Sequence, residues 1–275
     1  MLGWFKKSTK KLEPIDFTAV SVDIHSHLLP GIDDGAKDLE DSILMIKELK
    51  SLGFNKIITT PHIMSDLYKN NPQIINSSLL TLKQKLEEEK IEIEINAAAE
   101  YYVDYDFEQR IGKERFMTLD DKHLLIEFSF LESPRNMDDI IFKLQLEGYV
   151  IVLAHPARYQ YFSVEDYMSL HNRGVLFQLN LLSLIGYYSS QVKQNAELLI
   201  NNNMVSFVGT DCHNMNHAKL YHKCQTLSSW HQLVKRVALC DGISLFTFLN
   251  NPCNTFPGPT SITSERPSLI IFCII

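Results

Sequence analysis

The chain has 275 residues, of which 45% are hydrophobic and 21% are charged, so it is long enough to bury a large core. Its net charge of −7 argues against a general nucleic-acid binder, because no excess of basic residues is available to neutralise phosphates. Five scattered cysteines without a Cys-x-x-Cys pair, no signal peptide and no run of about 18 apolar residues predict a cytoplasmic protein without a membrane span.

The chain begins with a basic leader at 1–18, ahead of a predicted domain at 19–252. Within the leader, Trp4 and Phe5 lie beside lysines that suit an acidic membrane surface, but a frayed terminus is the simpler interpretation. Residues 253–275 are rich in Pro, Thr and Ser and then apolar, so we expect a tail outside the domain.

The first predicted strand, over 19–24, is followed by two histidines. Alternation along an extended backbone points His25 and His27 to the same side. Neutral imidazoles converging at one strand end can bind one divalent metal ion. Asp33 and Asp34 follow in a loop bounded by glycines and offer oxygen ligands beside the two ring nitrogens.

The rest of the chain alternates predicted helices with short apolar strands. Helices are expected over 38–52, 72–90, 137–147, 164–172 and 191–201, and strands over 56–60, 91–96, 124–126, 149–154, 175–179 and 204–208. This alternation is typical of βαβ units in a parallel α/β sheet. Seven strands in about 230 residues favour a closed barrel. An open doubly wound sheet is the alternative, but no Gly-x-Gly-x-x-Gly follows the first strand.

Side chains that can bind metal end six of the seven predicted strands. In chain order they are His25 with His27, His62, Glu100, Glu127, His155, and Asp211 with His213. The strand over 175–179 ends instead in Asn180. Catalytic groups of parallel barrels gather at the carboxyl ends of the strands, so coincidence is a poor explanation. With Asp34 there are nine candidates, enough for two or three ions at three or four ligands each.

These donors also indicate the chemistry. Mixed imidazole and carboxylate ligands without thiolate favour Mn, Fe or Zn in a catalytic site. Clustered divalent ions generate a bound hydroxide and neutralise charge in a phosphoryl displacement. Arg158, three residues after His155, is the predicted phosphate-binding residue, because a guanidinium can clamp phosphate with two nitrogens. Tyr101, Tyr102 and Tyr159 either line an aromatic mouth or pack at the barrel rim.

The ordered motifs resemble the polymerase and histidinol phosphatase (PHP) superfamily. More closely, they resemble the bacterial manganese-dependent tyrosine-protein phosphatases of capsule and exopolysaccharide gene clusters. The motifs are Asp23-Ile24-His25-Ser26-His27, Thr59-Thr60-Pro61-His62, Ala99-Glu100-Tyr101-Tyr102, Leu125-Ile126-Glu127-Phe128, Ala154-His155-Pro156-Ala157-Arg158-Tyr159 and Asp211-Cys212-His213-Asn214. The resemblance covers about Val20 to Pro252.

This resemblance implies a distorted (β/α)7 barrel with up to three Mn²⁺ ions. The implied ligand sets are His25, His27, Glu100 and Asp211 for one ion, Glu100, Glu127 and His155 for a second, and Asp34, His62 and His213 for the third. Arg158 matches the phosphate-binding arginine of that family. The implied substrate is a phosphotyrosine cluster on a membrane-associated tyrosine kinase, whose dephosphorylation regulates polysaccharide export.

One departure from the family concerns the phosphate. Some members carry a second phosphate-binding arginine a few residues after the Asp-x-His motif, and this chain has none there. Lys219, His217 and Arg135 are the alternative cations, although lysine and histidine lack the planar fork of arginine.

The same residues bear on other possible functions. A cysteine-dependent tyrosine phosphatase is excluded, because no cysteine has an arginine six residues later. An amidohydrolase would usually have a lysine and a histidine where this chain has Glu127 and Asn180. A proofreading nuclease is disfavoured by the acidity. A small phosphomonoesterase such as histidinol phosphatase and a metal-stabilised scaffold that binds a kinase without turnover stay open, as does an oligomer.

Overall fold

The computed structural model describes residues 12–239 of the chain. The expected leader at 1–18 therefore falls mostly outside the described residues. Trp4, Phe5, the end of the predicted domain at 240–252 and the expected tail at 253–275 also lie outside them. Among the residues described, no helix combines the length and the apolar character needed to cross a membrane.

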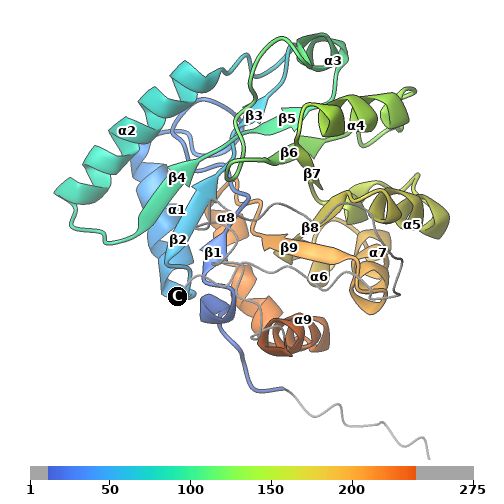
Figure 1. The fold of residues 1–275 in the computed structure, drawn as a ribbon. Coiled ribbons are helices and arrows are strands. Elements are labelled where there is room, and N and C mark those ends of the chain that lie inside the picture. The colour runs from blue at the N-terminus through green and yellow to red at the C-terminus, as the bar shows by residue number, and fades with distance from the viewer. Residues whose placement is uncertain (1–11, 240–275) are drawn as a thin grey trace, which may run out of the picture.

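Short parallel strands run through the centre of the molecule (Figure 1). The strands are β1 (Val22–Asp23), β2 (Lys56–Thr59), β3 (His62–Ile63), β4 (Glu94–Ala97), β5 (Glu100–Tyr102), β6 (His123–Glu127), β7 (Val150–Leu153), β8 (Leu176–Asn180) and β9 (Val205–Gly209). They pair in the orders β1-β2-β4 and β3-β5-β6-β7-β8-β9, and every pair is parallel. The predicted parallel α/β architecture is confirmed.

The two sheets combine into seven strands, two of which are interrupted. β3 directly continues β2, and β5 directly continues β4, so nine strands less two interruptions make seven. The backbone bonds carry on across both breaks, since Ala98 N donates to Thr59 O at 2.9 Å and Glu100 N donates to Pro61 O at 3.1 Å.

The first and last strands meet at their carboxyl ends. Asp211 N donates to His25 O at 2.7 Å, and His27 N donates to Cys212 O at 3.0 Å. β1 and β9 therefore pair through the residues that follow them and not along the strands themselves, so the circle of strands is irregular at this point. The architecture is therefore the distorted (β/α)7 barrel, and its first and last strands meet at the end where the predicted ligands lie.

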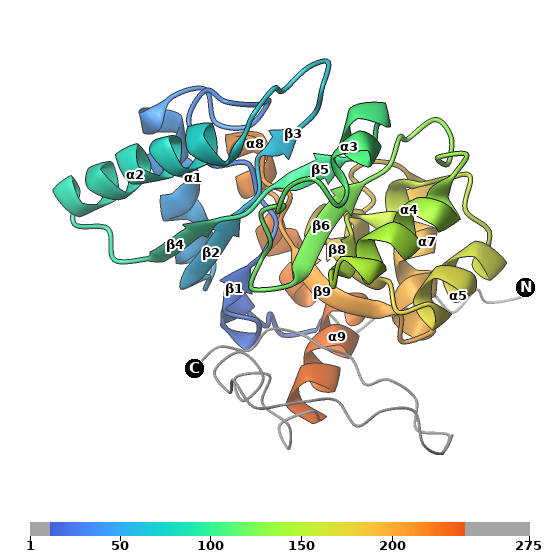
Figure 2. The same ribbon diagram turned by 45° about the horizontal axis from the view of Figure 1, so that its top comes forward.

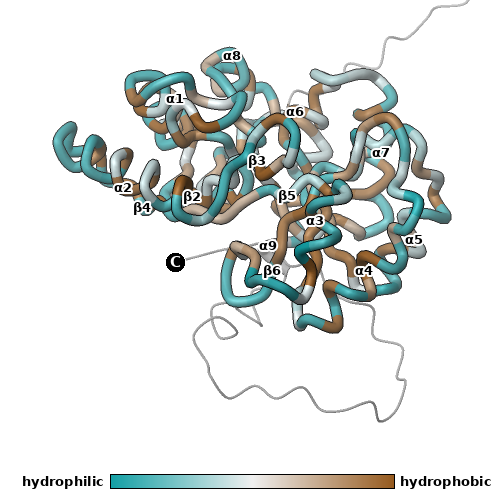
Figure 3. Tube along the Cα trace, turned by 90° about the horizontal axis from the view of Figure 1, so that it is seen from above, coloured by the Kyte–Doolittle hydropathy of each residue, from teal (hydrophilic) through white to brown (hydrophobic). Residues whose placement is uncertain are grey.

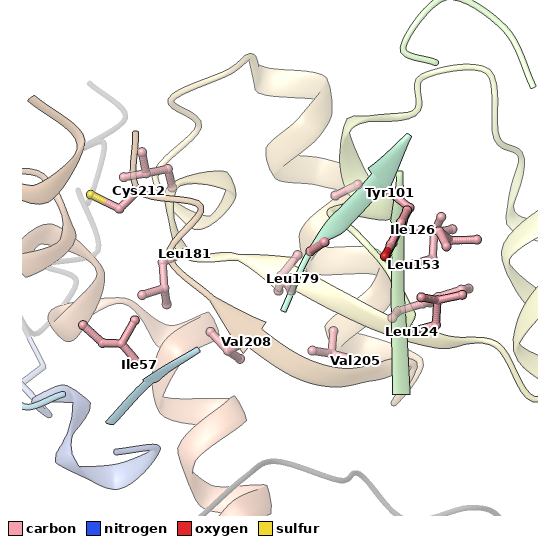
Figure 4. Close-up of a cluster of buried hydrophobic side chains, with 14 of the residues drawn as sticks. Ile57, Tyr101, Leu124, Ile126, Leu153, Leu179, Leu181, Val205, Val208 and Cys212 are labelled. Atoms are coloured by element: carbon pink, nitrogen blue, oxygen red, sulfur yellow. The ribbon is translucent and has the colours of Figure 1, made fainter. Parts of the chain in front are cut away.

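Alternate strand residues face two separate hydrophobic clusters. The smaller cluster comprises Val22, Ile24, Ile58, Ala98, Leu119, Leu125, Val152, Ala154 and Phe207, and it fills the inside of the barrel. The larger cluster packs the strands against the helices, and Figure 4 shows Leu124 and Ile126 of β6 in it beside Leu153 of β7. Since Leu125 faces inward, the next inward position on β6 is Glu127.

The helices surround the strands (Figure 2). They are α1 (Leu39–Ser51), α2 (Pro72–Glu88), α3 (Tyr105–Arg110), α4 (Met137–Leu146), α5 (Val164–Asn172), α6 (Leu181–Leu184), α7 (Ser190–Asn201), α8 (Met215–Ala218) and α9 (Ser228–Leu239), with 3-10 turns η1 (Phe17–Ala19), η2 (Pro156–Arg158) and η3 (Tyr221–Thr226). The strands at the centre are largely hydrophobic, whereas much of α2 is hydrophilic (Figure 3).

Side-chain caps explain why the predicted helix starts are accurate. Asp38 accepts from Asp41 N at the start of α1, and Asn71 accepts from Ile74 N at the start of α2. Ser163 forms a reciprocal capping box at the start of α5, which spans the predicted residues 164–172. The five predicted helices are confirmed within two residues at either end.

Two predicted strands are wrong in extent. The strand expected over 19–24 is only Val22–Asp23, because 17–19 form η1 and Ser21 has a left-handed backbone with φ of 60°. The strand expected over 91–96 begins only at Glu94. The short helices α3, α6 and α8 were not predicted, since helices of four to six residues hold too little periodicity to detect. The longer α9 was also missed.

Candidate metal centre and phosphate pocket

The nine side chains singled out in the sequence converge at the carboxyl ends of the barrel strands. His25 and His27 come from the segment after β1, Glu100 from β5 and Asp211 from the segment after β9. His25 Nε2 lies 3.2 Å from Glu100 Oε2 and 3.5 Å from Asp211 Oδ1. His27 Nε2 lies 3.5 Å and 3.4 Å from the same two atoms. Four groups distant in sequence thus surround one point.

The remaining five candidates extend the cluster on both sides. His155 Nε2 lies 3.0 Å from Glu100 Oε1 and 3.4 Å from Glu127 Oε1. On the other side, Asp34 Oδ1 lies 3.6 Å from His62 Nε2 and 3.5 Å from His213 Nε2. The Asp34 side chain is half exposed, whereas Glu100 is fully buried.

The spacing of these donors fits shared metal ions. Two ligands that hold one ion at about 2.1 Å in a tetrahedral arrangement lie about 3.4 Å apart. The Nε2 atoms of His25 and His27 are 3.3 Å apart. Glu100 Oε2 and His62 Nδ1 are buried without a hydrogen-bond partner within the described part of the chain, a costly arrangement unless a cation lies between such groups.

Within residues 12–239, three groups of side chains have donor atoms that all lie within 4.8 Å of one another. They are His25, His27 and Glu100; His62, Glu100 and Glu127; and His27, Asp34, His62 and His213. The grouping differs from the implied ligand sets in three respects. Asp211 is absent from the group of His25, His27 and Glu100; His62 rather than His155 joins Glu100 and Glu127; and His27 joins Asp34, His62 and His213. Glu100 belongs to two groups, which is the bridging position expected for it.

Outer hydrogen bonds fix which nitrogen faces the cluster in three of the five candidate imidazoles. His25 Nδ1 lies 2.9 Å from Gln178 Oε1, and His27 Nδ1 lies 2.8 Å from Asp33 Oδ2. An acceptor at Nδ1 requires the proton there, which leaves Nε2 as the electron-pair donor toward the centre. His213 follows the same pattern, with Nδ1 at 2.9 Å from Asp211 O.

Asp33 is thus an orienting residue rather than the oxygen ligand first considered beside Asp34. Its carboxylate also accepts from Gly35 N at 3.0 Å and His62 N at 3.1 Å. Burial opposes its ionisation, but the His27 imidazole lowers the pKa of Asp33 to about 2. A side chain at Gly35 would collide with the His27 backbone, since an added Cβ would lie 2.0 Å from His27 O.

Two left-handed residues turn ligands into the barrel. Ala154 faces inward on its strand, so the next residue would face outward if the backbone stayed extended. His155 instead has φ of 34°, and Asp211 has φ of 55°. Non-glycine residues rarely adopt this conformation, and it is concentrated at functional sites.

The protein environment shifts the pKa values of the three buried carboxylates in different directions. Burial opposes ionisation, but His25 holds the pKa of Glu100 well below its usual range, and His213 does the same for Asp211. Burial and the Glu100 carboxylate raise the pKa of Glu127 well above its usual value. Burial lowers the pKa of His155 to about 4. A bound cation would favour the ionised form of every carboxylate and the neutral form of every imidazole.

A pocket of about 360 Å³ opens onto the cluster. It is lined by Asp34, His62, Glu127, Phe130, His155, Arg158, Tyr188, Asp211, His213, Asn214 and His217. The Arg158 guanidinium carbon lies 4.1 Å from the Phe130 ring centre and 4.4 Å from the Tyr188 ring centre. Its Nη1 lies 3.3 Å from Asp211 Oδ2. Arg158 is therefore clamped between two aromatic faces beside the metal-competent cluster.

His217 is the one alternative cation that the structure places at the pocket. Its Nδ1 lies 3.4 Å from His213 N, and its ring packs edge-on against Tyr187 at 5.1 Å. Lys219 and Arg135 are exposed side chains that do not line the pocket.

The aromatic residues at the mouth differ from those considered in the sequence. Tyr101 and Tyr159 are buried, and their hydroxyls accept from Met117 N and Phe128 N, so both pack the barrel instead. Phe130 and Tyr188, which the sequence did not single out, line the pocket.

Two amides at the end of β8 were also missed as functional residues. Gln178 orients His25, and Asn180 Nδ2 donates to Asp211 Oδ2 at 2.5 Å. The one strand end without a metal-competent residue therefore supplies partners for the ligands of its neighbours. The signal available in the sequence was a pair of amides two residues apart in an otherwise apolar strand, which places them on one face.

Cys212 lies between two candidate ligands but faces away from the pocket. Its thiol is fully buried beside Met45, and burial raises its pKa to about 12. A thiol that stays protonated is a poor nucleophile, in agreement with the exclusion of cysteine-based catalysis.

Comparison with known proteins places the chain in a family. The family model for capsular polysaccharide synthesis, CpsB/CapC, matches residues 21–230. The tyrosine-protein phosphatase YwqE of Bacillus subtilis (strain 168) is 34% identical over 197 residues, which are 70% of this chain and 78% of YwqE. The tyrosine-protein phosphatase CpsB of Streptococcus agalactiae is 28% identical over 203 residues, 71% of this chain and 84% of CpsB.

A solved structure is also similar to this chain in its fold. It comes from the crystal structures of YwqE from Bacillus subtilis and CpsB from Streptococcus pneumoniae, described as unique metal-dependent tyrosine phosphatases. The similarity has a TM-score of 0.73 at 29% identity and covers 88% of this chain and 99% of that chain. The chain therefore belongs to the CpsB/CapC family of capsular polysaccharide synthesis proteins.

Proposed function

We propose that this protein is a metal-dependent protein-tyrosine phosphatase that acts in capsular or exopolysaccharide synthesis. The observation that carries the proposal is one pocket that is lined both by the clamped Arg158 and by six of the nine candidate ligands. The relatives named tyrosine-protein phosphatases support the same activity. They do not favour the histidinol phosphatase alternative.

The ligand sets follow the family pattern. His25, His27, Glu100 and Asp211 would hold one ion; Glu100, Glu127 and His155 a second; and Asp34, His62 and His213 a third. Mn²⁺ suits this mixture of imidazoles and carboxylates, and Fe or Zn are alternatives. Divalent ions bound there supply an activated water at neutral pH and offset the charge of a phosphate group.

Side chains around that centre bind the phosphate group and orient the metal ligands. Arg158 presents two nitrogens to phosphate oxygens, while Phe130 and Tyr188 hold the plane of its guanidinium. Gln178 and Asp33 keep the electron pairs of His25 and His27 directed at the cluster. Phosphate binding would draw Arg158 from its present partner Asp211 and leave that carboxylate to a metal.

The physiological substrate follows from the family's role in capsule synthesis. We propose a phosphotyrosine tail on a membrane-associated tyrosine kinase, reached from the cytoplasm. The net charge of −7 gives the pocket no general attraction for anions, so binding depends on the local cation centre and Arg158.

The test compares two phosphate esters on metal-stripped protein after Mn²⁺ is restored. We expect hydrolysis of a phosphotyrosine peptide to exceed that of histidinol phosphate, and a chelator to abolish it. A preference for histidinol phosphate would establish the small-molecule phosphatase instead. A fully metal-loaded protein that hydrolyses neither ester would favour the scaffold.

A further inference from the structure

Exposed apolar side chains lie next to the phosphate pocket, on the loop that joins β6 to α4. Phe130 lines the pocket although 42% of its surface is exposed, and Leu131 beside it is 90% exposed. A leucine exposed to this degree gains nothing from the fold of the chain itself. Its position next to Phe130, which lines the pocket, makes it available to a bound molecule.

Local contacts hold this loop in place. The Phe130 ring lies 5.5 Å from the His155 ring and 5.9 Å from the Tyr159 ring, in addition to its contact with Arg158. The Ser129 carbonyl accepts from Tyr161 OH at 2.8 Å, and Ser129 Oγ accepts from Leu131 N at 3.1 Å. The apolar edge is therefore presented by an ordered turn beside the cluster.

The opposite edge of the pocket is also aromatic. Tyr188 covers the other face of Arg158, and Tyr187 is 46% exposed next to it. When the phosphate of an ester binds at Arg158, the alcohol part of that ester would thus lie against apolar surface. That surface complements a flat aromatic ring and the residues on either side of it.

We propose that Phe130 and Leu131 form a substrate-docking edge that selects a phosphotyrosine within a polypeptide. Phe130 contacts the ring of the phosphotyrosine, and Leu131 contacts the side chain of a neighbouring residue in the peptide. This inference rests on the proposed phosphatase function and adds to it the residues that distinguish a peptide from a small aryl phosphate.

The test uses one substitution with a matched control. Leu131→Ser removes the proposed peptide contact, and Leu146→Ser changes another exposed leucine, 70% exposed on α4, that has no chain neighbour lining the pocket. Both Mn²⁺-loaded variants and the unmodified protein are assayed for kcat/KM on a phosphotyrosine peptide and on phenyl phosphate. Binding of the same peptide with a non-hydrolysable phosphonate in place of the phosphate is measured by fluorescence anisotropy.

We expect Leu131→Ser to lower the ratio of peptide to phenyl phosphate kcat/KM about fivefold, with a matching loss of phosphonate-peptide binding. Leu146→Ser should leave both measurements at the level of the unmodified protein. An unchanged ratio in Leu131→Ser, with normal hydrolysis of phenyl phosphate, would overturn the docking edge and leave the phosphatase function intact. Failure of the unmodified loaded protein on both substrates would overturn the proposed function and the docking edge together.

Discussion

Glu100 is the residue on which the candidate centre depends most. It is fully buried, and its two oxygens lie within 3.2 Å of nitrogens of His25, His62 and His155. Replacing Glu100 with glutamine would remove the negative charge that binds cations and would keep the volume of the side chain.

We expect Glu100→Gln to lower kcat at least about a hundredfold and to reduce the bound metal. Glu94→Gln, at an exposed glutamate on β4, is the control and should change neither quantity. The measurements are turnover of a phosphotyrosine peptide and metal analysis of the purified proteins. Normal turnover in Glu100→Gln would refute the assignment of the centre.

Cys212 provides the opposite case, a reactive residue type in the middle of the site without a chemical role. Its buried thiol contacts Met45 and the Asn214 carbonyl rather than the pocket. Cys212→Ser should therefore keep kcat close to that of the unmodified protein, because a hydroxyl can donate to the same carbonyl. Complete loss of turnover with full metal content would contradict a water-based mechanism.

His217 lines the pocket where the family pattern led us to consider a substitute for a second arginine. Loss of one hydrogen bond to a charged phosphate typically weakens binding about tenfold or more. We expect His217→Ala to raise KM for the phosphotyrosine peptide about tenfold with a smaller change in kcat, and Lys219→Ala to leave KM unchanged. If the lysine variant alone raised KM, the phosphate partner would have been assigned to the wrong side chain.

At the scale of elements, the close approach of β9 to the segment after β1 positions His25. A Cβ added at Gly209 would lie 2.7 Å from His25 Cβ and 2.8 Å from Gln178 Nε2. Neither group can move without disturbing the hydrogen bond that orients His25.

Gly209→Ala should therefore destabilise the protein by about 1–3 kcal/mol and also weaken metal binding. Urea unfolding of the metal-free protein measures the first effect, and titration with Mn²⁺ measures the second. An alanine variant with unaltered stability and metal affinity would show that β8, β9 and the first strand are not packed as described.

All the candidate ligands except Asp34, which lies in the loop after His27, stand out in the sequence because they come at the ends of predicted apolar strands, and parallel strands bring their carboxyl ends together. Helix starts were predictable from local caps such as Asp38 and Ser163. Gln178, Phe130 and Tyr188 were not, because their roles depend on neighbours far away in the chain. The left-handed backbone conformation at His155 could not be predicted either, because no local sequence pattern requires it.

At the scale of the whole molecule, the cluster connects the first and last strands of the barrel. His25 and Asp211 are separated by most of the described chain, yet they belong to one network that also includes β5, β6 and the turn after β7. Metal ions at this junction would hold the strands together, because the cations would offset the electrostatic repulsion between the buried carboxylates that these strands carry.

Metal binding should therefore stabilise the fold as a whole. We expect Mn²⁺ at about 100 times its Kd to raise the Tm of the stripped protein by about 5–10 °C, and a chelator to reverse the change. Mg²⁺, which prefers oxygen ligands, should have a smaller effect at the same concentration because most of these donors are imidazoles. Equal stabilisation by the two ions would indicate binding away from the histidines.

The central claim is that several metal ions together make this pocket a phosphotyrosine phosphatase. It is tested most directly by adding Mn²⁺ stepwise to stripped protein while measuring both bound metal and hydrolysis of a phosphotyrosine peptide. We predict that hydrolysis stays low until more than one ion per chain is bound and reaches its maximum at two or three. Full hydrolysis by the metal-free protein, or a fully loaded protein without hydrolysis, would contradict the claim.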